Sequence, residues 1–169
     1  MANQYCTKYH ANYNFFDVID SEEKAYWLGF IAADGTVPKV REPNSFCVNI
    51  RLANKDFHHL EKFKKNLNSN HIVRTRKVTK VGLVNGTFDV AEYCVYNTQL
   101  AKSILNYNIR PKGSMRMPNL EDNTRHFIRG YFDGDGSFSF GEKIQTSFVA
   151  ESKQFLEDIQ LHFKEKLVV

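Results

Sequence analysis

The 169-residue chain has little cysteine, little proline, one tryptophan and no long apolar run. Its three cysteines are odd in number and form no CxxC pair, so we expect reduced thiols instead of a disulfide framework or a structural zinc site. No apolar stretch approaches the roughly 20 residues of a membrane span, and the first residues lack a signal-peptide core. We therefore expect an intracellular protein, cytoplasmic or nucleoid-associated, without a membrane partner.

Positive charge is concentrated in one part of the chain. The net charge is only +4, but residues 55–80 contain eight basic side chains and two acidic ones. Such a cluster suits a polyanion, because each neutralised phosphate releases condensed counterions. The lysines of residues 62–65 are equally typical of a solvated helix face. Arg74, Arg76 and Lys80 instead alternate with other residues in a strand-like run, which predicts one positive face of a sheet.

Hydrophobic spacing and turn residues divide residues 20–108 into alternating helices and strands. Asp20 and Ser21 precede two acidic residues, which is typical of a helix start. Asn85 and Gly86 lie between two alternating runs, which indicates a hairpin. We predict helices at 20–34, 55–68 and 98–107, and strands at 36–42, 45–53, 71–81 and 87–97.

The same order begins again after a connector at residues 109–120. A helix leads into residues 133–136, and strands at 137–141 and 144–150 and a helix at 152–166 follow. We therefore predict an α+β fold built as a pseudo-twofold repeat of α-β-β-α-β-β-α units. The predicted parts are an aromatic-rich extension (1–19), a first repeat (20–108), the connector and a second repeat (121–169).

The two copies share a motif at the end of the first helix. WLGFIAADG at residues 27–35 aligns with IRGYFDGDG at residues 128–136. Glycine inside a helix costs about 1 kcal/mol relative to alanine, so two matched glycines need a reason. Gly29 with Ala33, and Gly130 with Gly134, form a stripe of small residues on each helix, and such stripes allow close packing of helix backbones. We predict that the two helices cross at these stripes.

This crossing would bring Asp34 and Asp135 together, each at the C-terminal end of its helix. A carboxylate there is disfavoured by the helix dipole, and a second carboxylate adds repulsion. The arrangement is favourable when a hard divalent cation lies between the two, because Mg²⁺ binds one or two carboxylates and completes its shell with water and phosphate oxygens. A single Asp-Gly could merely end a helix; two copies at matched offsets favour the metal site.

The paired motifs resemble those of the LAGLIDADG homing endonucleases in their two-motif, single-chain form. The resemblance extends over residues 20–166 and includes the element order and the connector IRPKGS at 109–114. It implies two antiparallel sheets that form a saddle along the DNA major groove, with the motif helices at the interface. It also implies a sequence-specific enzyme, associated with intron or intein mobility, that cuts both strands and leaves 3′ overhangs. The implied cofactor is Mg²⁺ or another divalent cation such as Mn²⁺.

The resemblance assigns roles to particular residues. Asp34 and Asp135 correspond to the metal-binding catalytic acids, with main chain from Gly35 and Gly136 beside them. A pair after the second strand corresponds to Asn54 and Lys55, where Asn54 would position solvent and Lys55 would steady the attacking water or the developing charge. A helix N-cap at Asn54 with an exposed lysine is the equally weighted alternative. Strand side chains that we predict to contact DNA are Asn49, Arg51, Arg74, Arg76, Lys77, Lys80, Asn85 and Tyr93.

The second repeat departs from the pattern by its length. From Asp34 to Tyr107 there are 73 residues, whereas from Asp135 to Val169 there are 34. We expect it to lack its second hairpin and closing helix, which would leave an exposed strand edge. A second protein chain that completes this repeat is therefore a candidate partner.

Three functions remain open at this point. The first is a metal-dependent endonuclease acting on double-stranded DNA. The second is a DNA- or RNA-binding remnant, either a regulator or an intron maturase, which retains the fold but has lost productive cleavage. The third is a hydrolase that uses the two aspartates as an acid and base pair, for example on glycosides. The basic cluster at residues 55–80 argues against the third.

Overall fold

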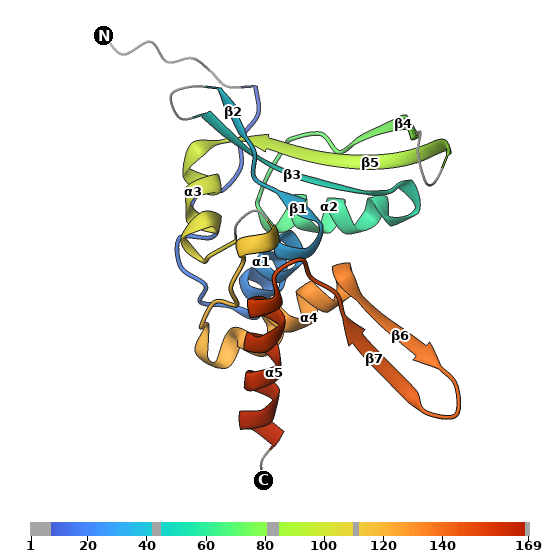
Figure 1. Ribbon diagram of the computed structural model, residues 1–169. Coiled ribbons are helices and arrows are strands. Elements are labelled where there is room, and N and C mark those ends of the chain that lie inside the picture. The colour runs from blue at the N-terminus through green and yellow to red at the C-terminus, as the bar shows by residue number, and fades with distance from the viewer. Residues whose placement is uncertain (1–7, 42–44, 81–84, 110–111, 168–169) are drawn as a thin grey trace.

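The computed structural model describes residues 8–41, 45–80, 85–109 and 112–167. Two repeats meet at a pair of crossed helices, α1 (Glu22–Asp34) and α4 (Thr124–Asp135) (Figure 1). Ser21 caps α1 by accepting a hydrogen bond from the Lys24 backbone N–H at 3.3 Å, as the sequence predicted. The turn predicted near residues 42–44 and the tip of the hairpin at 81–84 lie outside the described residues.

The helix crossing depends on glycine. A Cβ atom added to Gly29 would lie 2.0 Å from the Phe127 carbonyl oxygen, and one added to Gly130 would lie 2.0 Å from the Tyr26 carbonyl oxygen. Backbone therefore packs against backbone, with no room for a methyl group in either direction. The predicted role of the small-residue stripe is seen in full, because Gly134 also lies directly against Ala33.

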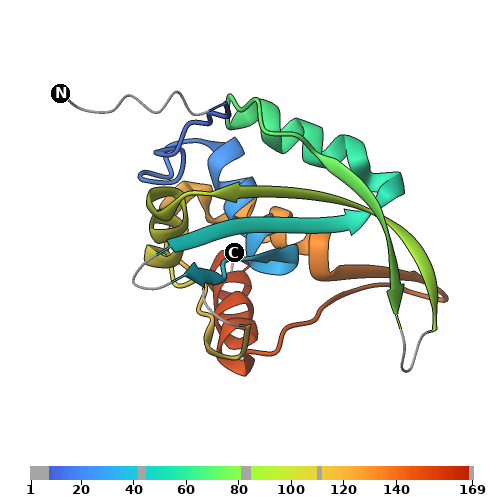
Figure 2. The same cartoon turned by 90° about the horizontal axis from the view of Figure 1, so that it is seen from above.

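The first repeat contains a five-stranded antiparallel sheet. Its strands are β1 (Gly35–Thr36), β2 (Lys39–Arg41), β3 (Ser45–Ala53), β4 (Arg74–Lys80) and β5 (Gly86–Tyr96). Their order is β1-β3-β5-β4, and β2 also pairs with β3. Figure 2 shows β3 and β5 extending side by side across the helices. The sheet presents one face to the helices and leaves the other open.

Helices cover the inner face of this sheet. They are α1, α2 (Phe57–Asn66) and α3 (Thr98–Asn106), and a short 3-10 helix, η1 (Asn54–Asp56), precedes α2. Apolar residues at every second strand position, such as Val48, Ile50 and Val95, are buried beneath the helices. The N-terminal segment packs here too, since Phe16 is fully buried and the Asn12 N–H donates to the Leu67 carbonyl.

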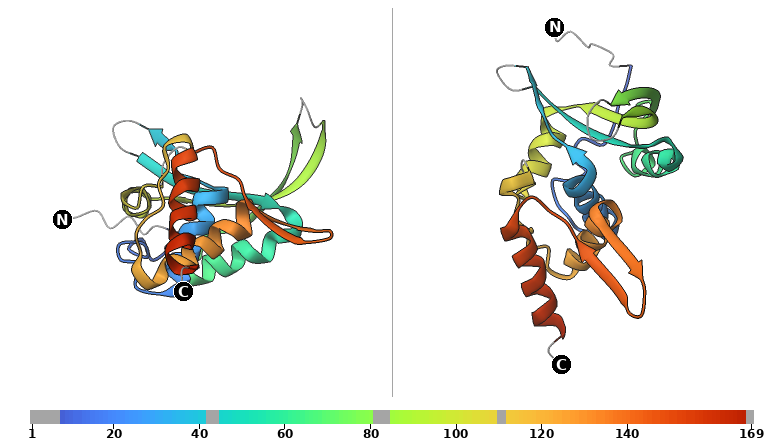
Figure 3. Two further views of the ribbon diagram at one scale, coloured as in Figure 1. Left: turned by 60° about the horizontal axis from the view of Figure 1, so that its bottom comes forward. Right: turned by 45° about the vertical axis from the view of Figure 1, so that its right-hand side comes forward.

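The second repeat follows the connector, which contains η2 (Lys112–Ser114) and η3 (Glu121–Asn123). After α4 come β6 (Gly136–Phe140), β7 (Ile144–Phe148) and α5 (Lys153–Leu167). The β6–β7 hairpin projects away from the first sheet (Figure 3). Within the described residues, α5 is the last element, so nothing there corresponds to β4, β5 or α3. Each described helix is too short or too polar to cross a bilayer.

Candidate functional site

The crossing of α1 and α4 places the two motif aspartates near each other. Gly35 and Gly136 end the helices, and the N–H of each donates to a carbonyl in the preceding turn. A Cβ atom on Gly134 would lie 3.1 Å from Asp34 Oδ2, so the Asp34 carboxyl lies directly against α4. Asp34, Gly35, Asp135 and Gly136 thus share one end of the helix pair, as the sequence predicted.

The electrostatics of the pair agree with this geometry. Burial raises the pKa of the Asp34 carboxyl above its ordinary value, and the negative charge of Asp135 raises it further. The positive charge of Lys112 acts in the opposite direction. Lys112 Nζ lies 3.6 Å from Asp135 Oδ2. Two like charges in a half-buried setting, with an ammonium beside them, are an arrangement that favours cations.

The surroundings of the two aspartates differ. A cavity of about 390 Å³ beside Asp34 is lined by two more acids, Asp56 and Asp133. Asp133 accepts a hydrogen bond of 2.8 Å from the Tyr26 hydroxyl, which also lies 3.2 Å from His59 Nε2. Burial lowers the pKa of His59 and raises that of Tyr26. The Asp34 side of the interface is therefore acidic and polar.

Asp135 lies instead between a cation and a phenol. Lys112 is on one side, and the charge of Asp135 contributes, after burial, to raising the pKa of Tyr131. The Tyr131 hydroxyl donates to the Val149 carbonyl at 2.8 Å. Sequence reasoning missed Lys112, although it lies in the connector IRPKGS that carried part of the family resemblance. It also missed Asp56.

Asn54 and Lys55 lie in η1 and both are exposed. The alternative role of Asn54 as the N-cap of the following helix is not observed, because Asp56 occupies that position. The η1 side chain that lines the cavity beside Asp34 is Asp56. The solvent-positioning roles of Asn54 and Lys55 remain predictions.

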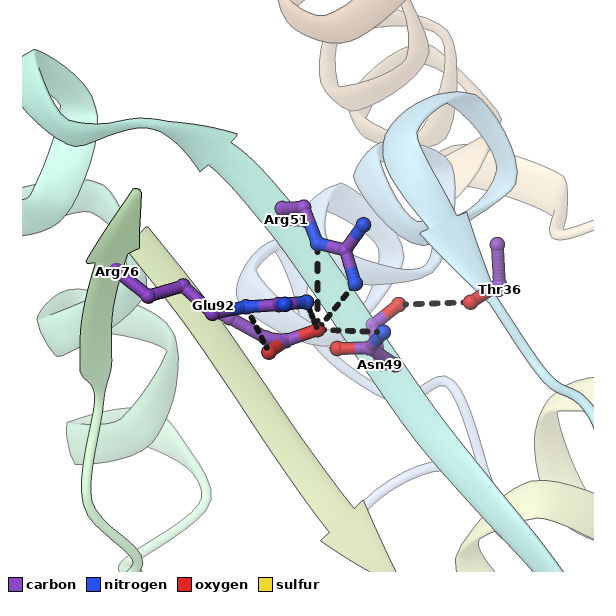
Figure 4. Close-up of polar contacts among 5 residues, drawn as sticks. All are labelled: Thr36, Asn49, Arg51, Arg76 and Glu92. Carbon is purple, nitrogen blue, oxygen red and sulfur yellow. Dashed lines mark hydrogen bonds and ion pairs between the residues drawn. The ribbon is translucent and has the colours of Figure 1, made fainter. Parts of the chain in front are cut away.

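A second polar cluster occupies the open face of the five-stranded sheet (Figure 4). Glu92 accepts hydrogen bonds from Arg51 at 2.6 Å and from Asn49 at 3.2 Å, and it forms an ion pair of 3.2 Å with Arg76. Burial alone would raise the pKa of Glu92, but these hydrogen bonds and the two arginine charges outweigh it, so the pKa is lowered. A carboxylate thus fixes three side chains that the sequence predicted as DNA contacts.

The other predicted contacts divide between the two faces of the sheet. Arg74 pairs with Glu92 across the strands and shares the open face with Arg76. The backbone of Lys80 pairs with Gly86 at the end of β4. Lys77 has the opposite parity, as the alternation of Arg74, Arg76 and Lys80 with other residues implied; it is exposed, and its DNA contact stays a prediction. Asn85 is exposed just before β5.

The prediction of a DNA contact for Tyr93 is wrong. The side chain is 1% exposed and lies in the core, where its ring packs edge-on against Phe63 at 5.7 Å between centroids. Its strand neighbours Glu92 and Cys94 face the open side, and alternation therefore directs Tyr93 inward. Alternation in the sequence could not show which set of residues faces the helices.

Comparison with known proteins shows what this chain is similar to. A model of the LAGLIDADG-like domain matches residues 122–165. The homing endonuclease I-WcaI, solved bound to its DNA recognition sequence, is 13% identical with a TM-score of 0.55, and the match covers 75% of this chain and 56% of that one. The LAGLIDADG meganuclease I-CpaMI on uncleaved DNA is 13% identical with a TM-score of 0.47, covering 85% and 73%. No curated protein matches the sequence.

The matched residues 122–165 contain the second motif, and the likeness to I-WcaI shows the fold. Both findings support the resemblance to the LAGLIDADG homing endonucleases that the sequence predicted, and the predicted α+β pseudo-twofold fold with an incomplete second repeat is confirmed. The chain spans 56% of the length of the I-WcaI chain that it matches.

Proposed function

We propose that the chain is a sequence-specific endonuclease of the homing type that hydrolyses phosphodiester bonds in double-stranded DNA. The observation that carries the proposal is the juxtaposition of Asp34 and Asp135 where α1 and α4 cross. A protein that only binds DNA gains nothing from two carboxylates that repel each other and the phosphates. The DNA-bound state of I-WcaI, which has the same fold, supports the choice of substrate.

The donor set suits a divalent cation, Mg²⁺ or Mn²⁺. Two carboxylates offer the oxygen ligands that hard cations prefer, and Asp34 is held half-buried against α4. Among the described residues, no group of three or more His, Cys, Asp or Glu side chains could hold a metal ion by itself. This agrees with a site in which water and phosphate oxygens provide the other ligands. Such an ion, when bound, polarises the phosphate and lowers the pKa of water.

The side chains of the protein have separate tasks in this proposal. Asp34 and Asp135 hold the cation between the repeats, with main chain of Gly35 and Gly136 beside them. The open face of the sheet, where Glu92 holds Arg51 and Arg76, binds the duplex through phosphates and base edges. Asn54 positions solvent near the scissile phosphate, and Lys55 steadies the attacking water or the developing charge.

The proposal is tested by selecting duplexes that bind the chain from a randomised library and then measuring their cleavage. We expect cleavage with Mg²⁺ that stops in EDTA. Asp34→Asn and Asp135→Asn should each reduce the cleavage rate by at least about 100-fold and change DNA affinity by only a few-fold. Asp122→Asn, an exposed acid of η3, is the matched control and should cleave normally. Cleavage that persists in EDTA contradicts the proposal.

A DNA- or RNA-binding remnant, either a regulator or an intron maturase, is the second candidate. The observation that favours it is the second sheet, which has two strands in the described residues instead of five. The same experiment separates the two functions, because a remnant binds selected nucleic acid but does not cut it with Mg²⁺.

We also propose that a second protein chain completes the second repeat. A groove of about 790 Å³ between β7 and α5 is lined by apolar side chains that include Phe148, Leu156 and Phe163. In the first repeat the corresponding position is occupied by β5, which pairs with β3 and contacts α2. Sedimentation should therefore find the protein in a complex heavier than a single 19.6 kDa chain. A single-chain species at every concentration excludes a second copy of this chain as that partner.

A further inference from the structure

Lys112 belongs to the connector between the repeats and to neither motif. It begins η2, and its ammonium lies 3.6 Å from Asp135 Oδ2. Its side chain also lines a cavity of about 260 Å³ together with Gly35 and Thr36, which follow the end of α1. The connector thus brings one cation to the ends of both motif helices.

The charges around the Lys112 ammonium explain its role. Asp34 and Asp135 repel each other, and Asp56 adds a further negative charge that acts on Asp34. Among the described residues, Lys112 is the basic residue whose charge opposes this repulsion at Asp34, and it forms an ion pair with Asp135. Its side chain is 44% exposed, and its flexible four-carbon stem allows the ammonium to move away.

We propose that Lys112 is a positioning residue that acts as the internal counter-ion of the Asp34–Asp135 pair, and that a divalent cation must displace its ammonium to bind there. The inference rests on the proposed function, because it requires a cation site at the two aspartates. An ammonium and a divalent cation compete for the same carboxylate oxygens, since each is stabilised by the same negative charge. The connector therefore sets the affinity of the site for its cation.

The counter-ion role predicts that replacing Lys112 raises the affinity of the site for a divalent cation. Replacing a residue that only supports the fold weakens a metal site, whereas removing a competing cation strengthens it. Lys112→Met should therefore bind Mn²⁺ about three- to fivefold more tightly than the wild type, as expected for losing a partly exposed ion pair. Without metal, the same variant should unfold at a lower temperature, because the repulsion between the two aspartates is no longer balanced.

The experiment is a calorimetric titration of the full chain with Mn²⁺ alone, without DNA, together with thermal unfolding in EDTA. Lys112→Arg retains the charge and should keep the wild-type affinity. Lys102→Met makes the same change on an exposed residue of α3 and should alter neither measurement. In an Asp135→Asn background, Lys112→Met should no longer tighten binding, because the ion-pair partner is gone.

The outcomes separate this inference from the proposed function. If the wild type binds Mn²⁺, Asp135→Asn weakens that binding, and Lys112→Met leaves it unchanged or weaker, the counter-ion role is wrong and the metal site stands. If the wild type binds no Mn²⁺ at the aspartates, both are overturned. Tighter binding by Lys112→Met, with Lys112→Arg unchanged, supports the counter-ion role.

Discussion

The two repeats share a motif and an element order. They differ in how completely the amphipathic helix after their strands is covered, which is α2 in the first repeat and α5 in the second. Three apolar residues follow the start of α2 at offsets of three, six and ten: Leu60, Phe63 and Leu67 are all fully buried. The same offsets in α5 hold Leu156, Ile159 and Phe163, of which Leu156 is partly exposed and Phe163 is 38% exposed. One apolar pattern is thus fully buried in the first repeat and only partly buried in the second, where Ile159 is buried but Leu156 and Phe163 are not.

The difference shows that burial is conferred by the partner segments, since the pattern in the helix is the same. In the first repeat, Phe63 packs against Tyr93 of β5 and against Phe16 of the N-terminal segment. In the second repeat, Phe163 packs against Phe148 of β7, at 6.1 Å between ring centroids. The amphipathic helix is present in both repeats, and within the part of the chain that the structure describes, a strand corresponding to β5 covers it in the first repeat alone.

Truncating a leucine at the same helix position tests this comparison most strongly. Leu60→Ala should lower the free energy of unfolding by about 2–5 kcal/mol, because it leaves a cavity in a closed core. Leu156→Ala should cost less than about 1.5 kcal/mol, because water already reaches this side chain. Urea unfolding of both variants gives the two values. Equal losses would mean that α5 is as well covered as α2.

Filling the helix crossing should affect both repeats alike. Gly29→Ala and Gly130→Ala should each cost up to about 3 kcal/mol, although alanine favours helices, because the added methyl group meets a backbone carbonyl that cannot retreat. Gly141→Ala in the β6–β7 turn has open space around it and should change stability by less than about 0.5 kcal/mol. Chemical denaturation of each variant measures these changes in the free energy of unfolding. A harmless Gly29→Ala variant would exclude the close crossing.

Neutralising Glu92 should have the smallest effect, and only the first repeat offers this site. The folded-state pKa of Glu92 is lowered, so its contribution to stability is present above its ordinary pKa and is lost as the pH falls through the folded-state value. Glu92→Gln should therefore cost about 1 kcal/mol at pH 7 and almost nothing near pH 2.

The control for this prediction is Asp122→Asn. The change in the free energy of unfolding that it causes should not depend on the charges of Arg51 and Arg76. Removing the carboxylate also releases two arginines, so Glu92→Gln should bind DNA more tightly at low salt. A cost that is the same at both pH values would mean that Glu92 does not hold the arginines in solution.

The sequence allowed the elements and the central contact to be predicted, because these depend on local patterns. Apolar spacing located the helices, and two glycines at matched offsets located the crossing and hence Asp34 and Asp135. It could not show which face of β5 is buried, so Tyr93 was assigned to DNA although it lies in the core.

Residues that reach the site from distant elements were also beyond prediction. Lys112 meets Asp135 only because the connector folds back across the helix ends. Glu92 appeared as one acid in a basic region, and its function of holding Arg51 and Arg76 depends on the register of three strands. Contacts that depend on register and on chain reversal carry no signal in the local sequence.

The most direct test of the account is to locate the cation. Crystals of the chain soaked with Mn²⁺ should show an anomalous scattering peak between Asp34 and Asp135, with an oxygen of each carboxylate about 2.0–2.6 Å away. A peak at neither aspartate, or carboxylates that lie too far apart to share one ion or two adjacent ions, would contradict the assignment of this helix crossing as a nuclease site.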